Sequence, residues 1–284
     1  MPKLQIIKTS RAMQKLADSY RRKNKTIGLV PTMGALHEGH VSLIRKSVSQ
    51  NDITVVSIFV NPTQFGPNED FSKYPRAFKA DCELAKKAGA NAIFHPEVKE
   101  MYPDNFQTFV VPGKIADKLE GAARPGHMQG VATVCTKLFN IIKPHRAYFG
   151  QKDAQQLAVI KSVVRDLNLN LQIVGCPIVR TKGDVAMSSR HSYLSPEQLK
   201  YAEVIHDSLK LAKMLIQKGE RNIKSIRMQM AGMIESVPET TVEYIAFNRW
   251  DDLDELTEIK GKVLISLIVR IAGVRLLDNV IVKI

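Results

Sequence analysis

Apolar, β-branched runs alternate with segments of helical spacing through the first 180 residues of this chain. The runs typical of buried strands lie at residues 26–30, 53–60, 91–94, 147–149 and 171–174. The helical segments between them lie at 41–48, 77–88, 132–142 and 153–167. Strands joined by helices of this length pair in parallel through right-handed crossovers that cover both faces of the sheet. The pattern predicts an α/β fold with a Rossmann-like parallel sheet and helices on both faces.

The pattern changes near residue 180. A long helix is expected at 196–217, because Ser195-Pro196-Glu197 combines a serine cap with proline at the first helical position. A second helix is expected at 223–234, and strands at 242–247, 263–271 and 275–282, the last two at hairpin spacing. We therefore expect two domains, residues 1–180 and a smaller C-terminal α+β domain at residues 181–284.

The chain is strongly basic, with 41 Lys and Arg against 28 Asp and Glu and a formal net charge of +13. Such a charge favours anionic partners, either nucleic acid or small phosphorylated substrates. The one dense basic run, at residues 21–25, is better explained as a solvated helix end. No aromatic-basic RNA-binding motif is present, so we expect no nucleic-acid partner.

Two further features bear on the expected location. The longest apolar run, residues 263–268, is far shorter than the ~20 residues of a membrane-spanning helix, and the N-terminus lacks the pattern of a secretory signal. The three cysteines, Cys82, Cys135 and Cys176, are widely spaced and form no CxxC pair. We expect a cytoplasmic protein that has no membrane contact and no disulfide framework.

Polar residues gather after the first predicted strand, where residues 31–40 include His37, Gly39 and His40 and lead into a helix. Ligands of open α/β sheets bind beyond the carboxyl ends of the strands. A helix N-terminus also favours an anion. Imidazoles placed there can donate hydrogen bonds to a phosphate. A zinc site is a weaker reading, because partner ligands are absent nearby in the sequence, and we expect no protein-bound metal.

The His-x-Gly-His turn resembles the HIGH signature of the nucleotidyltransferase superfamily. More narrowly, the chain resembles the pantothenate synthetase (pantoate–β-alanine ligase) family. The matching pieces are residues 30–34 with His37 and His40, 57–62 with Gln64-Phe65, Tyr74-Pro75-Arg76, 119–121 with 124–127, 149–153 with Gln155-Gln156, and 187–190. They occur in order, and a weaker match follows at residues 275–279.

The resemblance implies an ATP-dependent enzyme that adenylates pantoate and then joins it to β-alanine, releasing pyrophosphate and AMP. Mg²⁺ is expected to neutralise the triphosphate. The expected partners are these small molecules and a second copy of the chain, in a homodimer built through the N-terminal domain. The same resemblance makes residues 1–180 the domain that binds ATP and pantoate, and residues 181–284 a lid.

The resemblance also assigns site residues. His37, His40 and Lys152 are the expected catalytic residues, with His40 as the proton donor. The expected ATP contacts are Met33, Gly34, Ala35, Leu36, His37, Glu38, Gly39, His40, Gly150, Gln151, Lys152, Asp153, Val179, Met187, Ser188, Ser189 and Arg190. Gln64 and Gln156 are the expected pantoate contacts, because their side chains offer donors and acceptors together.

The sequence departs from the family pattern in three places. Gly183-Asp184 stands where Asp-Gly is usual, His191 where Asn is commoner, and Thr63 where Met is commoner. Two alternatives remain at this point: a nucleotidyltransferase that acts on another acid or phosphate, and a nucleic-acid-binding protein. The first would show pyrophosphate exchange without pantoate, and the second would show an affinity that falls steeply with salt.

Overall fold

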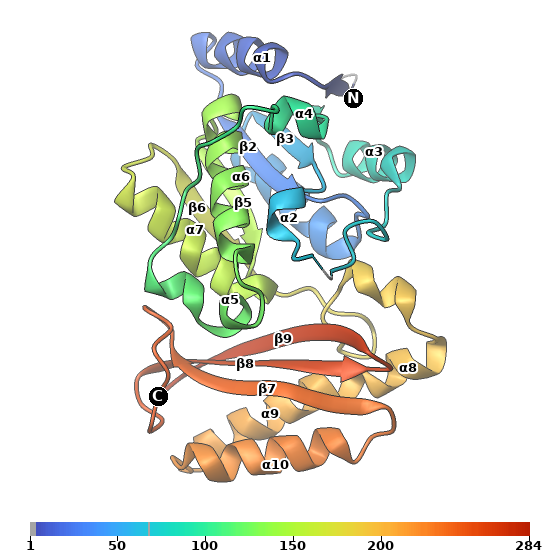
Figure 1. Ribbon diagram of the computed structural model, residues 1–284, viewed down its shortest axis with the longest axis vertical. Helices are drawn as coiled ribbons and strands as arrows, with labels where there is room; N and C mark the ends of the chain where they lie inside the picture. Colours follow the sequence, from blue (N-terminus) through green and yellow to red (C-terminus); the bar gives the residue numbers. More distant parts are fainter. Residues whose placement is uncertain (1–3, 68) are drawn as a thin grey trace. The chain divides into compact units, whose positions relative to one another are not determined.

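The computed structural model describes residues 4–67 and 69–284, which form two compact units (Figure 1). The first unit comprises the described residues up to Gln151 together with Gln155–Pro177. The second comprises Lys152–Ala154 and Ile178–Ile284. A short piece of chain before residue 178 therefore packs with the C-terminal unit, which a single division near residue 180 does not anticipate.

The first unit is built on a six-stranded parallel sheet in the order β1-β4-β3-β2-β5-β6. The strands are β1 (Gln5–Ile7), β2 (Ile27–Thr32), β3 (Ile53–Ile58), β4 (Ala92–Phe94), β5 (Arg146–Gly150) and β6 (Gln172–Cys176). The five predicted strands are confirmed, and β1 was not predicted. The predicted Rossmann-like parallel sheet is also confirmed.

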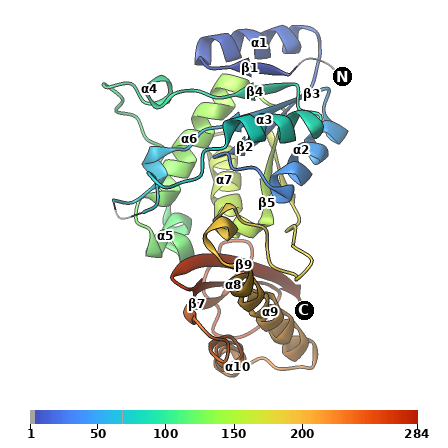
Figure 2. The ribbon, with the colours of Figure 1, turned by 90° about the vertical axis from the view of Figure 1, so that its right-hand side faces the viewer.

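Helices cover both faces of this sheet. They are α1 (Ser10–Arg22), α2 (Glu38–Gln50), α3 (Phe78–Lys87), α4 (Val98–Met101), α5 (Leu119–Ala123), α6 (His127–Ile142) and α7 (Ala154–Asp166). Val30, Val56 and Ile93 face α2 and α3 in one apolar cluster. Alternate residues such as Leu29 point the other way. Figure 2 shows α2 and α6 on opposite sides of β2, and α6 contacts that strand.

Strand β2 continues through Pro31 to Thr32, beyond the end of the strand predicted at residues 26–30. Pro31 lacks the N–H that a central strand normally uses on one side. On one side of β2, the neighbouring strand β5 pairs only with Gly28 and Leu29. No hydrogen bond between β2 and β5 is therefore lost at Pro31. The strand therefore carries its pairing with β3 as far as Ile58.

The second unit contains an antiparallel sheet in the order β7-β8-β9, with strands β7 (Thr240–Arg249), β8 (Lys262–Ile271) and β9 (Val274–Lys283). The predicted hairpin is confirmed, and its turn places Ala272 and Gly273 at positive φ. The long helix expected at 196–217 is divided at Ala202 into α8 (Pro196–Tyr201) and α9 (Glu203–Gln217). Together with α10 (Ile223–Glu235), α9 packs its apolar residues against the sheet.

Short 3₁₀ turns complete the chain: η1 (Pro62–Gln64), η2 (Lys114–Asp117), η3 (Gln151–Asp153) and η4 (Ser189–Tyr193). Two of them lie soon after the carboxyl ends of parallel strands, η1 after β3 and η3 directly after β5. Over residues 4–67 and 69–284, no helix combines the length and the apolar character needed to cross a bilayer.

Candidate active site

The segment between β2 and α2 has a specific backbone conformation. Gly34 and Ala35 both have positive φ, +84° and +49°. The N–H of Gly34 donates to Thr32 Oγ1 (3.2 Å), and that hydroxyl donates to the carbonyl of Ser57 on β3 (2.7 Å). A Cβ at Gly34 would lie 3.0 Å from Asp81 Oδ2. Glycine is therefore required at this position for both conformation and space.

Asp81 anchors the same loop from the first turns of α3. Its carboxylate accepts the N–H groups of Ala35 (3.0 Å) and Leu36 (2.7 Å), and the residue is only 1% exposed. Burial raises the pKa of this carboxyl, although the two N–H groups oppose that shift. Asp81 was not among the predicted site residues. The only sign of it in the sequence was the position of this acid on the apolar face of a predicted helix, four residues before the buried Ala85.

His37 and His40 lie at the start of α2, with ring centroids 4.1 Å apart. His37 Nδ1 accepts the N–H of Gly39 (3.1 Å), and His40 Nδ1 accepts the N–H of His37 (3.3 Å). A ring nitrogen that accepts carries no proton, so each neutral imidazole has its proton on Nε2. Both rings are thus set as Nε2–H donors at a helix N-terminus, where an anion is favoured.

Gln64 is buried in η1, after β3. Its Oε1 accepts from Asn61 Nδ2 (3.0 Å), and its Nε2 lies 3.0 Å from Met33 Sδ. The structure thus brings together Met33, one of the expected ATP contacts, and Gln64, an expected pantoate contact. Gln156 is half-buried near the start of α7, whereas its neighbour Gln155 bonds the backbone near α5 and is structural.

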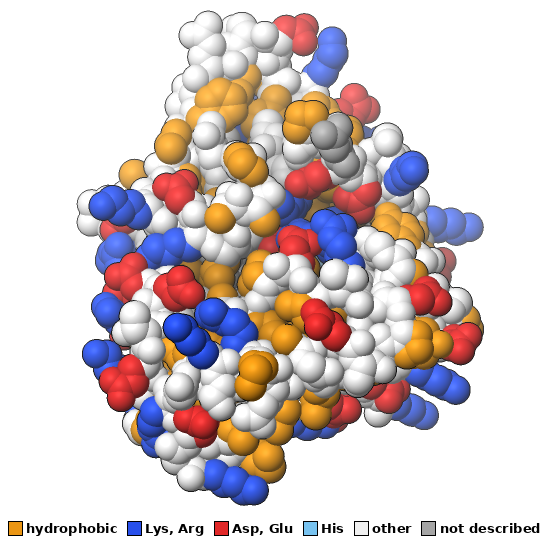
Figure 3. Space-filling model, turned by 60° about the horizontal axis from the view of Figure 1, so that its bottom comes forward, with side chains coloured by type: hydrophobic (Ala, Val, Ile, Leu, Met, Phe, Trp, Pro, Cys, Tyr) orange, Lys and Arg blue, Asp and Glu red, His pale blue; other side chains and the backbone are white. Residues whose placement is uncertain are grey.

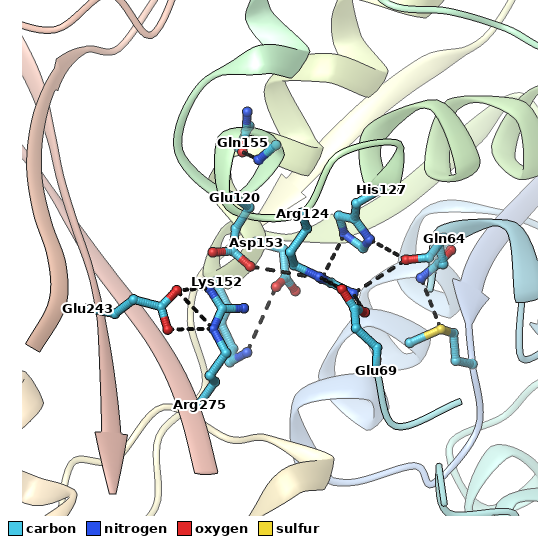
Figure 4. A network of polar contacts seen from close by, with 12 residues as sticks. Gln64, Glu69, Glu120, Arg124, His127, Lys152, Asp153, Gln155, Glu243 and Arg275 are labelled. Carbon is cyan, nitrogen blue, oxygen red and sulfur yellow. Dashed lines mark hydrogen bonds and ion pairs between the residues drawn. The ribbon is translucent and has the colours of Figure 1, made fainter. Parts of the chain in front are cut away.

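Residues 124–127, part of one of the segments that match the family, are tied to the Gln64 segment (Figure 4). Arg124 forms a bidentate pair with Glu69, and His127 Nδ1 lies 2.7 Å from the carbonyl oxygen of Gln64. Burial tends to raise the pKa of Glu69, but its bonds with Arg124 outweigh burial and lower it. Glu120 is a second carboxylate near Arg124, at 3.9 Å.

Lys152 lies in η3, two residues after the end of β5 at Gly150. Its Nζ is 3.9 Å from Asp153 Oδ1, and its side chain is mostly buried. Its backbone carbonyl accepts a hydrogen bond from Asn279 on β9 (2.8 Å). Asp153 directly precedes α7, and its side chain is half exposed.

The other nucleotide-assigned residues of the second unit form one folded loop. The N–H of Met187 donates to the carbonyl of Val179 (2.9 Å), and Ser188 Oγ accepts the N–H of Arg190 (3.2 Å) at the start of η4. In the Gly183-Asp184 departure, Asp184 has φ +62°, the left-handed conformation that favours glycine. Asp184 Oδ2 also forms an ion pair with Lys210 Nζ at 2.6 Å, a contact that a glycine at this position could not make.

The described residues contain no group of three or more His, Cys, Asp or Glu side chains that could hold a metal ion. His37 and His40 already use Nδ1 as backbone acceptors.

The other two positions that differ from the family pattern, His191 and Thr63, lie close in sequence to the assigned residues. Burial and the charge of Lys152 lower the pKa of His191, so this side chain adds no positive charge at neutral pH. Thr63 Oγ1 bonds Asn61 Oδ1 (3.0 Å).

Comparison with known families identifies the class of protein. The sequence profile described as pantoate-beta-alanine ligase matches residues 5–281. A pantothenate synthetase from Caldicellulosiruptor saccharolyticus is 54% identical over 272 residues, which cover 96% of this chain and 97% of the relative.

Solved structures agree with the sequence comparison. A pantothenate synthetase from Thermus thermophilus matches with a TM-score of 0.91 and 38% identity, covering 97% of this chain and 98% of the other. A pantoate-beta-alanine ligase from Francisella tularensis, complexed with beta-gamma ATP and beta-alanine, matches with a TM-score of 0.81 and 34% identity, covering 98% and 97%.

Proposed function

The chain belongs to the pantoate–β-alanine ligase family, and we propose that it joins the two substrates in two steps at the residues described above. The overall reaction is the ATP-dependent condensation of pantoate with β-alanine. The observation that carries the assignment of residues is the pair of backbone N–H bonds to Nδ1 of His37 and His40, which favour the tautomer with the proton on Nε2.

The first step makes the carboxylate of pantoate reactive. One carboxylate oxygen attacks the α-phosphorus of ATP, the bond to the bridging oxygen of the β-phosphate breaks, and pyrophosphate leaves. Negative charge grows on the phosphate oxygens, and donors fixed in advance stabilise it. We assign this role to the Nε2–H groups of His37 and His40, with His40 as the proton donor, and to the ammonium of Lys152.

The second step forms the amide. The amine of β-alanine attacks the acyl carbon of the pantoyl-adenylate, AMP leaves with the electrons of the acyl–oxygen bond, and the ammonium proton is lost. Gln64 and Gln156 would hold the hydroxyl and carboxylate groups of pantoate, since an amide side chain both donates and accepts. The buried position of Gln64 beside Met33 supports a site that excludes water from the acyl-adenylate.

The remaining nucleotide contacts are assigned by motif. Residues 33–40 would surround the triphosphate with the helix N-terminus, and Gly150, Gln151 and Asp153 would meet the nucleoside. Val179 and Met187 would frame the loop whose Ser188, Ser189 and Arg190 contact the phosphates. The backbone pairing of Val179 with Met187 supports treating this loop as one unit.

Mg²⁺ fits this scheme as the counter-ion of ATP. The ion is commonly held by substrate phosphates and water with few protein ligands, so the scheme requires no dedicated cluster of protein ligands. Bound to the triphosphate, Mg²⁺ would neutralise charge on the leaving pyrophosphate.

The test is direct. Purified protein is incubated with ATP, Mg²⁺, pantoate and β-alanine, and AMP and pantothenate are measured together with controls that each omit one component. AMP and pantothenate should form in equal amounts, and only when all four are present. AMP formed equally well without pantoate would contradict the proposal and favour another acid as the substrate.

The two earlier alternatives are less well supported. On the face shown in Figure 3, Lys and Arg side chains are scattered among Asp and Glu and form no single basic patch. That face therefore offers no footprint for nucleic acid, and the net charge is left to favour a small anionic substrate. Membership of the ligase family argues against a different acid or phosphate acceptor.

We also infer a homodimer formed through the first unit. Phe109 and Val111 expose large apolar side chains, and Val111 is 72% exposed. They lie on an extended segment that belongs to neither described sheet. Light scattering should give the mass of two chains for the wild type and of one chain for Val111→Glu. A monomeric wild type would contradict the inference.

We further propose that the enzyme works in the cytoplasm, and that residues 181–284 serve as a lid.

A further inference from the structure

A buried asparagine of the second unit contacts the backbone of Lys152. Asn279 lies on β9 and is only 1% exposed. Its Nδ2 donates to the carbonyl oxygen of Lys152 at 2.8 Å, across 127 positions of sequence. None of the roles assigned above involves Asn279.

The position of Asn279 is itself fixed by its neighbours. Asp278 Oδ1 accepts the N–H of Asn279 (2.7 Å), and the same carboxylate is held by Arg180 through bonds of 2.6 and 3.0 Å. Because adjacent residues of a strand point to opposite faces, Asp278 is available to Arg180 while Asn279 is available to Lys152. The chain of contacts runs from Arg180 through residues 278 and 279 to Lys152.

The segment that carries Lys152 needs such an anchor. Lys152–Ala154 packs with the second unit, while the residues directly before and after it pack with the first. A lysine ammonium acts as a point charge on a flexible four-carbon stem. Where that charge can reach therefore depends on where the backbone of Lys152 is held.

We propose that Asn279 is a positioning residue for adenylation, which acts by holding the Lys152 carbonyl and so directing the ammonium to the ATP phosphates. This inference rests on the proposed role of Lys152. It assigns to Asn279 no contact with a substrate. Loss of the bond should therefore affect the ATP-dependent step and leave pantoate binding unchanged.

A simple packing role is the competing explanation, and the chain offers a matched control. Asn248 on β7 of the same sheet is 4% exposed, and its Nδ2 donates to the carbonyl of Leu253 at 2.9 Å. Asn248→Ala removes the same buried side chain and the same type of bond, but has no link to Lys152. Both single variants should lower the melting temperature.

The experiment measures pantoate-dependent exchange of pyrophosphate into ATP for the wild type, Asn279→Ala, Asn248→Ala, Lys152→Ala and the double variant Asn279→Ala/Lys152→Ala. Asn279→Ala should lower kcat roughly 10- to 100-fold, the size expected for a misplaced catalytic group, with an unchanged KM for pantoate. Asn248→Ala should keep the wild-type rate. The double variant should be no slower than Lys152→Ala, because Asn279 acts only through that residue.

Wild-type rates in Asn279→Ala, or losses that multiply in the double variant, would overturn the inference. If Asn279→Ala does not fold, Asn279→Ser takes its place, because its hydroxyl is too short to reach the carbonyl but leaves a smaller void. A wild type that shows no pantoate-dependent exchange contradicts the proposed function itself. An active wild type with a fully active Asn279→Ala contradicts only the role of Asn279.

Discussion

The Asp81 carboxylate on α3 accepts the backbone N–H of Leu36 at 2.7 Å, in the loop that leads into both histidines. A second bond, from the N–H of Ala35, makes the contact bidentate. The histidine-bearing turn is therefore held by a side chain from a helix more than forty residues away in sequence, as well as by its own cap.

Asp81→Ala should weaken both stability and adenylation. One buried and one partly buried N–H group would lose their acceptor, at a cost of about 2 kcal/mol in the free energy of unfolding. The loop that carries His37 would also shift, which should lower the exchange rate roughly 10- to 100-fold. Urea unfolding and pyrophosphate exchange check both effects. The control is Asp166→Ala, an exposed acid at the end of α7. Equal effects of the two substitutions would contradict the anchoring role.

Gly34→Ala should be unfavourable for conformation and for space. The residue has φ +84°, and its added Cβ would lie 3.0 Å from Asp81 Oδ2 and 3.2 Å from Ile58 Cγ2. We expect a loss of about 1–2 kcal/mol in unfolding free energy, because the left-handed conformation alone costs about that much for an L-residue. Gly113→Ala is the matched control, since Gly113 has φ −75° and nothing within 4 Å of a new Cβ. The control should be neutral or slightly stabilising by thermal melting.

His37 can be tested for two separate roles, helix cap and phosphate donor. His37→Asn keeps an acceptor near the position of Nδ1 and removes the Nε2–H donor. It should keep the wild-type melting temperature and lose roughly 10²–10³ in exchange rate. His37→Gln keeps a donor farther out on the side chain and loses the cap, so it should lose about 1 kcal/mol of stability but retain more activity. The reverse order of activities would contradict the donor role.

Glu243 should make the stability of the second unit depend on pH. Its carboxylate receives Arg275 Nε (2.9 Å) and Arg270 Nη2 (3.0 Å), and it is 24% exposed. The hydrogen bonds from Arg275 are the main cause of its lowered pKa. A lowered pKa in the folded state gives stability above the unfolded value of about 4.3, which is lost as the pH falls through the folded value.

Glu243→Gln should therefore destabilise by about 1 kcal/mol at pH 7, and by progressively less as the pH falls through the lowered pKa that the carboxyl has in the folded state. Urea unfolding at a series of acidic pH values measures this decline. The exposed Glu235→Gln serves as the control on α10. A deficit that does not shrink as the pH falls would show that packing, not charge, is responsible.

The parallel sheet could be predicted because its signal is local. The β-branched runs and the helical spacing between them identified five of the six strands, and the histidine turn pointed to the end of β2. Helix boundaries were less predictable: the division at Ala202 has no proline or glycine to mark it. The site assignments themselves stay predictions, except that Met33 and Gln64 are now seen in contact.

Two contacts lay beyond sequence reasoning for a common reason. Asp81 reaches Leu36 across 45 positions, and Asn279 reaches Lys152 across 127. Neither spacing follows a helical or strand period, so no pattern within one element links the partners. Each contact depends on how separate elements pack. A buried acid or amide within an apolar pattern was the only sign available.

The passage of Lys152–Ala154 into the second unit bears on protein engineering. The C-terminal unit is not one continuous stretch of chain, so a chimaera joined at residue 177 would take its lysine turn from one parent and the asparagine that holds it from the other. Recombination between relatives should exchange the tripeptide at 152–154 together with residues 178–284, so that both partners descend from the same ancestor.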